Sequence, residues 1–392
     1  MTTRIRSVRM VAVAAAAATV AVTACSPGGG AASVPSASPH AGHGGSSPAP
    51  AQPLRPGERF LQLTMERPYA PSAPDGGTDE YRCLLIDPKL SGPAFLTGTQ
   101  FQPQNVPIVH HAIVFAVPPD AASEARAVDA RTPGDGWTCF GDGSVDDEHP
   151  SAWVDTWTPN GTETVLRQDV GFPLRAGSLL VLQIHYNLLA TGGRAGATDR
   201  SGVRLRLTAG TAATKPLEIL PLQAPTELPC AAGESGPLCD RAAAVADVTR
   251  RFGPGVGRTE SRLVDDCSAG TPVPGDTQHC DIPVPRPMTV YAALGHMHLL
   301  GRAIKIEINP GTAGAQTLLD VPSFNFDDQL LRPLAAPVRL KPGDTVRVTC
   351  THDAGLRRLL PQLRGLAPRY VVWGDGTSDE MCLGLLTATI GD

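Results

Sequence analysis

The apolar and polar positions of residues 58–392 alternate in short runs, a pattern typical of β-strands. Turns rich in proline and glycine separate these runs. The runs are FLQLTM, VPIVHHAIVFAV, SLLVLQIHYNLL, GVRLRLTA, LEILPLQ, TVYAALGHMHLL, AIKIEI, PVRLKPGDTVRVTC and CLGLLTATI. Few stretches keep a helical period over three turns, and the best short helices are AASEARAV and LRRLLPQL. Many short strands with turn signals predict an all-β protein built from sandwiches rather than from a parallel α/β sheet.

The N-terminal segment has a different composition. Three arginines precede an Ala/Val-rich run that ends in small residues before Cys25, which predicts a signal peptide over residues 1–24. The run from Met10 to Ala24 is short for a membrane span. VTAC resembles the bacterial lipobox, whose cysteine becomes the lipidated first residue; a conventional secretory signal is the alternative. We therefore expect an exported protein, lipid-anchored through Cys25 at the outer face of a membrane of the bacterial cell envelope.

Residues 25–57 consist mainly of Gly, Ser, Pro and Ala and predict a disordered spacer. The remaining length suits two domains of ordinary size, which we place at 58–210 and 211–392. The net charge is −5 and there is no long basic cluster, so a nucleic-acid partner is not expected. Eight of the nine cysteines remain once Cys25 is set aside, and none form a CxxC. An even number in an exported protein predicts disulfides, but eight cysteines allow 105 pairings.

The stretch GHMHLLG carries two histidines inside an apolar run. His296 and His298 would point to the same face of a strand, because side chains alternate along it. Two polar rings side by side in an apolar strand cost free energy unless something binds them. The plainer interpretation is a pair of hydrogen-bonded or exposed histidines, and the alternative is half of a metal site.

Further candidate ligands lie in two other predicted strands and just before the final predicted strand. His110 and His111 are adjacent in one apolar run, and His185 lies in another. The adjacent pair could reach one ion only at a strand end, at a bulge, or through different ring nitrogens. Met381 stands just before Cys382 and the final strand. A thioether is soft and selects Cu(I), whereas imidazole also suits Cu(II), so two histidines with one methionine would make a copper site for both oxidation states.

Four signatures, VHHAIVF, LQIHYN, GHMHLLG and GTSDEMC, occur in one order across residues 110–382. In this respect the chain resembles the copper type II, ascorbate-dependent monooxygenases, which include peptidylglycine α-hydroxylating monooxygenase and dopamine β-monooxygenase. The resemblance implies two jelly-roll-like antiparallel β-sandwich domains that face each other across a cleft. Each domain would carry one copper ion.

The resemblance also implies the roles of the ligands. His110, His111 and His185 match the copper that stores and delivers an electron, in the N-terminal sandwich. His296, His298 and Met381 match the copper that binds O2 and oxidises the substrate. The implied activity is hydroxylation of a C–H bond with O2 and an external one-electron reductant, expected to be ascorbate. A non-catalytic surface copper-binding lipoprotein for copper capture or delivery is the alternative. A zinc hydrolase is disfavoured, because the chain lacks an HExxH motif and methionine is a poor zinc ligand.

The resemblance also implies two of the disulfides. Cys83 with Cys139 and Cys350 with Cys382 match disulfide pairs of the family. We expect the other two pairs to be Cys267 with Cys280 and Cys230 with Cys239.

The substrate pocket departs from the peptide-amidating branch of the family. That branch holds a substrate carboxylate with an arginine, an asparagine and a tyrosine, and this chain has Leu294, Leu383 and Leu385 at the matching positions. A carboxylate there would lose its hydration without gaining a donor. We therefore expect a small apolar or neutral substrate, bound by a monomer.

Overall fold

The computed structural model describes residues 50–72, 79–139, 143, 145, 149–159, 161–188 and 196–391. The expected signal peptide, Cys25 and most of the expected spacer lie outside the described residues. The structure is mainly β, with 43% strand and 14% helix, and nearly all strand pairs are antiparallel. This confirms the predicted all-β class and is consistent with two β-sandwiches.

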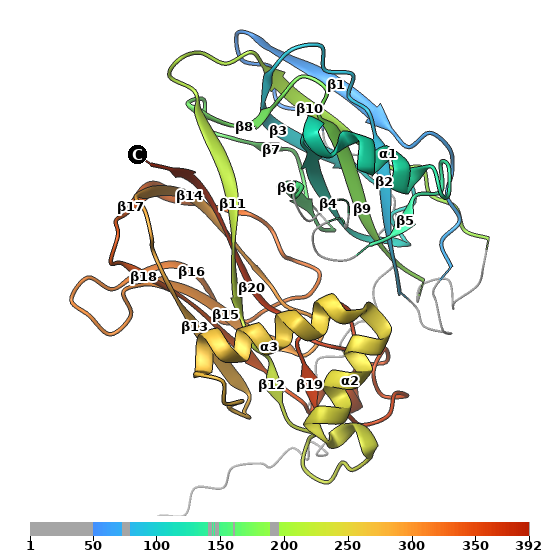
Figure 1. Cartoon of the computed structure of the whole chain (residues 1–392), viewed down its shortest axis with the longest axis vertical. Helices are drawn as coiled ribbons and strands as arrows, with labels where there is room; N and C mark the ends of the chain where they lie inside the picture. The colour runs from blue at the N-terminus through green and yellow to red at the C-terminus, as the bar shows by residue number, and fades with distance from the viewer. Residues whose placement is uncertain are drawn as a thin grey trace, which may run out of the picture. The chain divides into compact units, whose positions relative to one another are not determined.

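The first sandwich packs a five-stranded sheet against one half of a nine-stranded sheet (Figure 1). Buried residues of both sheets, such as Val114, Leu182, Leu96 and Leu205, form one hydrophobic core. The five-stranded sheet has the order β5 (Trp137–Thr138), β2 (Asp79–Ile86), β9 (Leu179–Asn187), β4 (Val109–Val117), β6 (Ala152–Trp157). Facing it are β1 (Glu58–Thr64), β10 (Gly202–Thr208), β3 (Ala94–Gln102) and β8 (Val170–Leu174), with β7 (Thr164–Val165) paired to β3.

The second sandwich packs the other half of the nine-stranded sheet against a four-stranded sheet. Val290, Leu386, Ile306 and Val348 contribute to its separate core. The nine-stranded sheet continues with β11 (Lys215–Ala224), β20 (Cys382–Ile390), β14 (Met288–His296) and β17 (Arg332–Leu340). The four-stranded sheet has the order β13 (Thr277–Pro283), β18 (Thr345–His352), β15 (Gly301–Ile308), β16 (Gln316–Val321), and a separate pair joins β12 (Glu227–Leu228) to β19 (Val371–Val372).

The two sandwiches share the nine-stranded sheet through a short parallel contact. Lys215 and Pro216 at the start of β11 pair with Val170 and Gly171 of β8. Beyond this point β11 runs antiparallel to β20, as Figure 1 shows in yellow-green and dark red. The boundary expected at 210/211 falls in the connection between β10 and β11.

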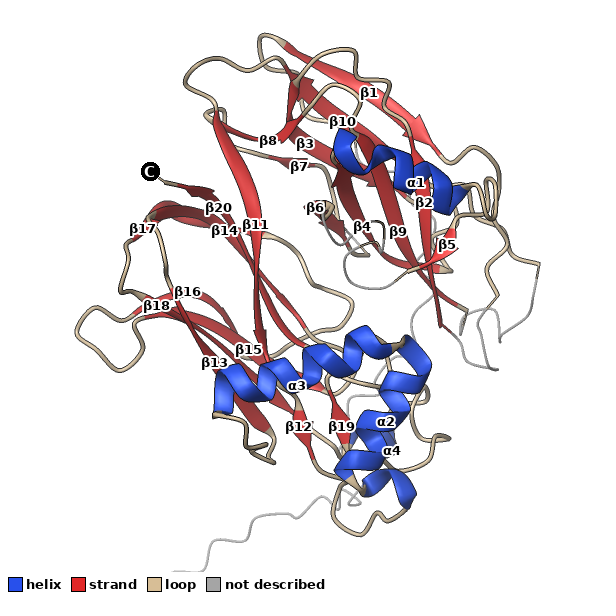
Figure 2. Ribbon diagram, viewed as in Figure 1, coloured by secondary structure: helices blue, strands red, loops and turns tan. Residues whose placement is uncertain are grey.

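Helices are more extensive than the sequence pattern predicts (Figure 2). The two expected short helices are present as α1 (Ala122–Asp129) and α4 (Leu356–Leu359). The structure adds α2 (Arg241–Phe252) and α3 (Pro254–Ser268), with short 3-10 turns at Pro119–Ala121 and Pro237–Cys239. The sequence pattern therefore does not predict the helices within residues 241–268. Among the described residues, no helix is both long enough and apolar enough to cross a membrane.

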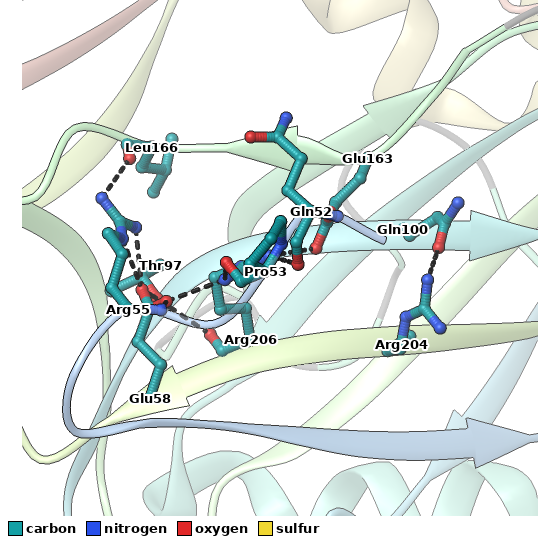
Figure 3. A network of polar contacts seen from close by, with 10 residues as sticks. All are labelled: Gln52, Pro53, Arg55, Glu58, Thr97, Gln100, Glu163, Leu166, Arg204 and Arg206. Carbon is teal, nitrogen blue, oxygen red and sulfur yellow. Dashed lines mark hydrogen bonds and ion pairs between the residues drawn. The ribbon is translucent and has the colours of Figure 1, made fainter. Parts of the chain in front are cut away.

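A buried ionic network fixes the start of the first sandwich (Figure 3). Arg206 of β10 is almost fully buried and lies 2.8 Å from Glu58 and 2.9 Å from Glu163. Its guanidinium also donates to the backbone carbonyls of Gln52 and Pro53. The segment before β1, expected as the end of the spacer, is thus bound to the sheet from Gln52 onward.

Replacing Glu58 with glutamine is expected to lower stability in a pH-dependent way. Burial alone would raise the pKa of Glu58, but hydrogen bonds from Arg55 and Arg206 outweigh it and lower the pKa from 4.5 to about 2. The charged carboxylate therefore stabilises the fold above pH 4.5, and this contribution disappears as the pH falls toward 2. We expect a loss of about 1.5–3 kcal/mol at neutral pH, typical of hydrogen bonds to a charged group. Urea unfolding at a series of pH values measures the loss of unfolding free energy. Glu124→Gln is the control, because Glu124 forms an exposed ion pair. A loss of stability in Glu58→Gln that stays constant down to pH 3 would contradict the prediction.

Candidate metal centre

The three histidines of the first sandwich meet where β4 pairs with β9. The register shifts between Val109 and His111, so that Val109 pairs with Tyr186 and His111 with His185. His110 is the extra residue of this irregularity. A bulge lets consecutive side chains depart from strict alternation, and here it brings His110 and His111 to the same centre. This is one of the three arrangements that the sequence left open for the adjacent pair.

The ring nitrogens of these histidines converge. One nitrogen from each of His110, His111 and His185 lies within 4.8 Å of the other two, and all three side chains are buried. The Nδ1 atom of His111 lies 3.2 Å from Nδ1 of His110 and 3.3 Å from Nδ1 of His185. Tyr81 stacks on the His185 ring with centroids 4.2 Å apart, which fixes the plane of that ring.

Two carboxylates set where the imidazole protons lie. His185 Nε2 is 2.9 Å from Asp79 and His110 Nε2 is 3.2 Å from Asp327. An ionised carboxylate only accepts hydrogen bonds, so each of these rings carries its proton on Nε2 and presents the lone pair of Nδ1 to the centre. Metal-binding histidines are oriented in this way. If His111 carries a proton on Nδ1, it can donate that proton to His110 or to His185, but not to both. A cation at the centre would instead accept the Nδ1 lone pairs of all three rings.

The protonation state of the cluster suits a metal as well. Burial lowers the pKa of His110 from 6.5 to about 4. Burial also holds the pKa of His111 well below 6.5, and the neighbouring His185 and His110 rings add to the effect. Both rings are therefore neutral at physiological pH, which is the form that binds metal ions.

The second pair of histidines lies at the end of β14 rather than inside a longer strand. His296 is the last residue of β14, and His298 follows in the turn that leads to Gly301 of β15. The expected strand TVYAALGHMHLL thus ends at His296, while Met297 turns into the hydrophobic core. The two imidazole rings still meet, with centroids 5.2 Å apart and perpendicular planes.

Each ring of this pair has a nitrogen suited to a metal. His296 Nδ1 bonds to the Oε1 atom of Gln329, whose amide is fixed because it donates to the Phe326 carbonyl at 2.8 Å. His296 therefore carries its proton on Nδ1 and has a lone pair on Nε2. The Nδ1 atom of His298 is buried and has no hydrogen-bond partner among the described residues. Burial lowers the pKa of His296 to about 3 and also lowers that of His298, so both rings are neutral.

Met381 lies beside these histidines because β20 pairs with β14. The antiparallel register joins His296 to Leu383, two residues after Met381. Glu380 ties the two segments together: its carboxylate accepts hydrogen bonds from the backbone N–H groups of His298 at 3.0 Å and Leu300 at 2.6 Å. The ligand-bearing turn is thus held to the residue that precedes Met381.

The two candidate ligand sets are adjacent. The rings of His111 and His296 have centroids 6.1 Å apart. A cavity of about 1130 Å³ lies beside both sets, with His111, His296, His298 and Met381 in its wall. Much of the remaining wall is aromatic or aliphatic, including Phe115, Trp153, Phe172, Ile219, Val256 and Trp373.

The leucines expected at the substrate pocket are only partly at the cavity. Leu294 and Leu383 line it, whereas Leu385 does not, although all three leucines belong to one buried core cluster. The two acids before Met381, Asp379 and Glu380, are buried rather than exposed. Asp379 forms an ion pair with Arg251 at 2.6 Å, and Glu380 bonds to backbone N–H groups.

The structure contains four disulfides, and they join the pairs expected from the sequence. They are Cys83–Cys139, Cys230–Cys239, Cys267–Cys280 and Cys350–Cys382. The last one anchors the start of β20, directly after Met381. The other described histidines do not join the candidate sets; for example, His279 is exposed on β13, and buried His352 lies 3.4 Å from Glu380.

Several residues that orient the ligands were not predicted from the sequence. Asp79, Asp327, Gln329 and Glu380 contact the histidines or the adjacent backbone. Their spacing from the histidines carries no recognisable signal, except for Glu380 within the GTSDEMC signature.

Comparisons with known proteins bear mainly on the second sandwich. Residues 276–387 match the family model described as copper type II ascorbate-dependent monooxygenase, C-terminal domain. This segment is therefore similar to the C-terminal domain of that family. It contains His296, His298 and Met381. No curated protein matches the chain.

Similarity to solved structures is weak. Dimeric latent PorU from Porphyromonas gingivalis is 11% identical, with a TM-score of 0.15, and the match covers 81% of this chain but 24% of that one. The coconut allergen cocosin is 9% identical over 85% of this chain and 86% of its own, with a TM-score of 0.15. Vicilin from Solanum lycopersicum is 9% identical over 80% and 74%, with a TM-score of 0.16. Similarities of this size carry no inference about function.

Proposed function

We propose that this chain is an exported copper-dependent monooxygenase that hydroxylates a C–H bond of a small apolar or neutral molecule. The observation that carries the proposal is the placement of two unlike ligand sets beside one cavity. One set has three imidazoles, and the other has two imidazoles and a thioether. The second set lies in the segment that matches the copper monooxygenase model.

The donor atoms fit copper. His110, His111 and His185 would hold one ion, and His296, His298 and Met381 would hold the other. Imidazole suits both oxidation states of copper, and the thioether favours Cu(I). When bound, the two ions supply one-electron redox chemistry, so that O2, two electrons and two protons convert R–H into R–OH and water. The electrons come from an external donor, for which we propose ascorbate.

The protein's own residues orient the ligands and bind the substrate. Asp79, Asp327 and Gln329 fix which nitrogen of each ring carries the proton, and the other nitrogen is left for the metal. Glu380 holds the backbone of His298 in place. The aromatic and aliphatic wall of the cavity would bind an apolar substrate and exclude water from the site of hydrogen abstraction.

The substrate class follows from the wall next to the histidines. Leu294 and Leu383 stand at the cavity where the peptide-amidating relatives have carboxylate-binding side chains. A carboxylate at this position would be desolvated without a donor, which costs more than the roughly 2–7 kcal/mol of a neutral polar group. We therefore propose that glycine-extended peptides are not substrates.

The four disulfides are typical of an extracytoplasmic protein. We further propose that a lipid on Cys25 anchors the chain to a membrane and that the Gly/Ser/Pro/Ala-rich segment acts as its spacer. Mass spectrometry of the membrane-bound protein tests this, since an unmodified N-terminal peptide would contradict it.

Oxygen uptake separates catalysis from simple copper binding. The copper-loaded protein is expected to consume O2 with ascorbate only when a substrate is present, and to form one alcohol per O2 consumed. A panel of apolar, aminated and carboxylated compounds, analysed with ¹⁸O2, identifies the substrate class, and apolar or neutral compounds should be oxidised best. Tight Cu(I) binding without substrate-dependent O2 uptake would favour the copper-capture alternative.

A further inference from the structure

The loop between β16 and β17 contacts histidines of both ligand sets. Phe326 stacks on His110 with ring centroids 4.4 Å apart, and its edge faces His298 at 6.4 Å. Asp327 accepts from His110 Nε2 at 3.2 Å. Gln329 bonds to His296. Three of the four residues 326–329 therefore contact histidines, and together they reach both candidate sets.

The contact between Asp327 and His110 joins the two sandwiches. His110 lies on β4 of the first sandwich, whereas Asp327 is 217 residues later and belongs to the second. The His110 side chain is buried, with 5% exposed, and that of Asp327 is 31% exposed. Asp79 makes the equivalent contact with His185, but it comes from the same sheet as its histidine.

We propose that Asp327 is a positioning residue for the three-histidine site, so that the second sandwich completes a metal site whose ligands all lie in the first. By accepting from Nε2–H, Asp327 holds His110 in the tautomer and orientation in which Nδ1 faces the other two rings. Its neighbour Phe326 prevents the ring from rotating away. The inference rests on the proposed copper site, but it concerns metal affinity rather than hydroxylation.

The chain offers a matched control at the next position. Asp328 has the same side chain and lies in the same loop, but its carboxylate is about half exposed and its ion pair with Arg332 spans 3.9 Å. Asp327→Asn supplies a second comparison, because the amide oxygen can still accept from Nε2–H although the charge is lost.

The experiment measures Cu(I) affinity against a chromophoric competitor. The full chain carries His298→Ala and Met381→Ala, which leave His296 and Gln329 in place but remove two ligands of the other site. Into this background are placed Asp327→Ala, Asp327→Asn and Asp328→Ala. Asp327→Ala is expected to weaken copper binding about 10- to 100-fold, the usual effect of losing a partner of a ligating histidine. Asp327→Asn should recover most of the affinity, and Asp328→Ala should match the background.

The outcomes separate this inference from the proposed function. Unchanged affinity in Asp327→Ala would overturn the inference, even if the wild type hydroxylates a substrate. An equal loss in Asp327→Ala and Asp328→Ala would also overturn it, because the loop would then act only through general folding. Weakened binding in Asp327→Ala alone, with metal-free melting temperatures equal among the variants, supports the inference whether or not the protein proves to be a monooxygenase.

Discussion

Replacing His296 and His298 together with alanine is expected to reduce the copper content from two ions per chain to one and to abolish hydroxylation. Only Met381 would remain of the second ligand set, and one thioether does not hold copper tightly. A bound metal ion stabilises the transition state by several kcal/mol, so the rate of hydroxylation should fall by about 10³-fold or more when the ion is lost. Copper analysis after dialysis and single-turnover product formation give the two readouts. The ion that remains should be held by His110, His111 and His185.

A control for this prediction is His279→Ala. His279 is exposed on β13, so its loss should leave both copper ions and the activity unchanged. Retention of two equivalents at wild-type affinity in the double variant would show that these histidines do not form a site.

The sequence predicts most of the sheet structure because burial follows the strand period. In β18, half-buried residues alternate with the buried residues Val346, Val348, Cys350 and His352. In β4 and β9 nearly every position is buried, so the apolar run identifies the strand but not which face each histidine takes. The register shift beside His110 depends on the pairing partner, which is a tertiary feature that one strand's sequence does not specify.

The features that the sequence does not predict depend on contacts between distant segments. The helices α2 and α3 begin at signals that are visible afterwards, with Asp240 capping the first and Pro254 in the first turn of the second. Glycine and polar residues interrupt their apolar pattern, and packing against the sheet compensates for it. Asp327 resembles any other loop aspartate until the fold brings it to His110.

The candidate ligands have one feature of the fold in common, since each signature places its histidines or methionine within a few residues of a strand end. GHMHLLG is explained by a turn: β14 ends at His296, Met297 enters the core, and His298 faces the same side again. The methionine more than eighty residues later reaches this turn through the pairing of β14 with β20.

Replacing Met381 with histidine is expected to keep copper bound while removing most of the activity. Three imidazoles make a good copper site, so the copper content should stay at two ions per chain. The harder ligand favours Cu(II) relative to Cu(I), which makes the reduced state less accessible. We expect hydroxylation to fall by about 100-fold, which corresponds to about 2.7 kcal/mol in the activation free energy.

Met297 provides the matched control for this experiment. It lies between the two histidines but is fully buried in the core, so Met297→Leu removes a nearby sulfur without removing a ligand. Exchange of these two similar side chains usually costs less than about 1.5 kcal/mol in stability. X-ray absorption on the fully reduced proteins should show, on average, one sulfur scatterer for every two copper ions in the wild type and in Met297→Leu. It should show none in Met381→His. A wild-type spectrum without a Cu–S contribution would remove Met381 from the site, and the protein would then be better described as a histidine-based copper binder.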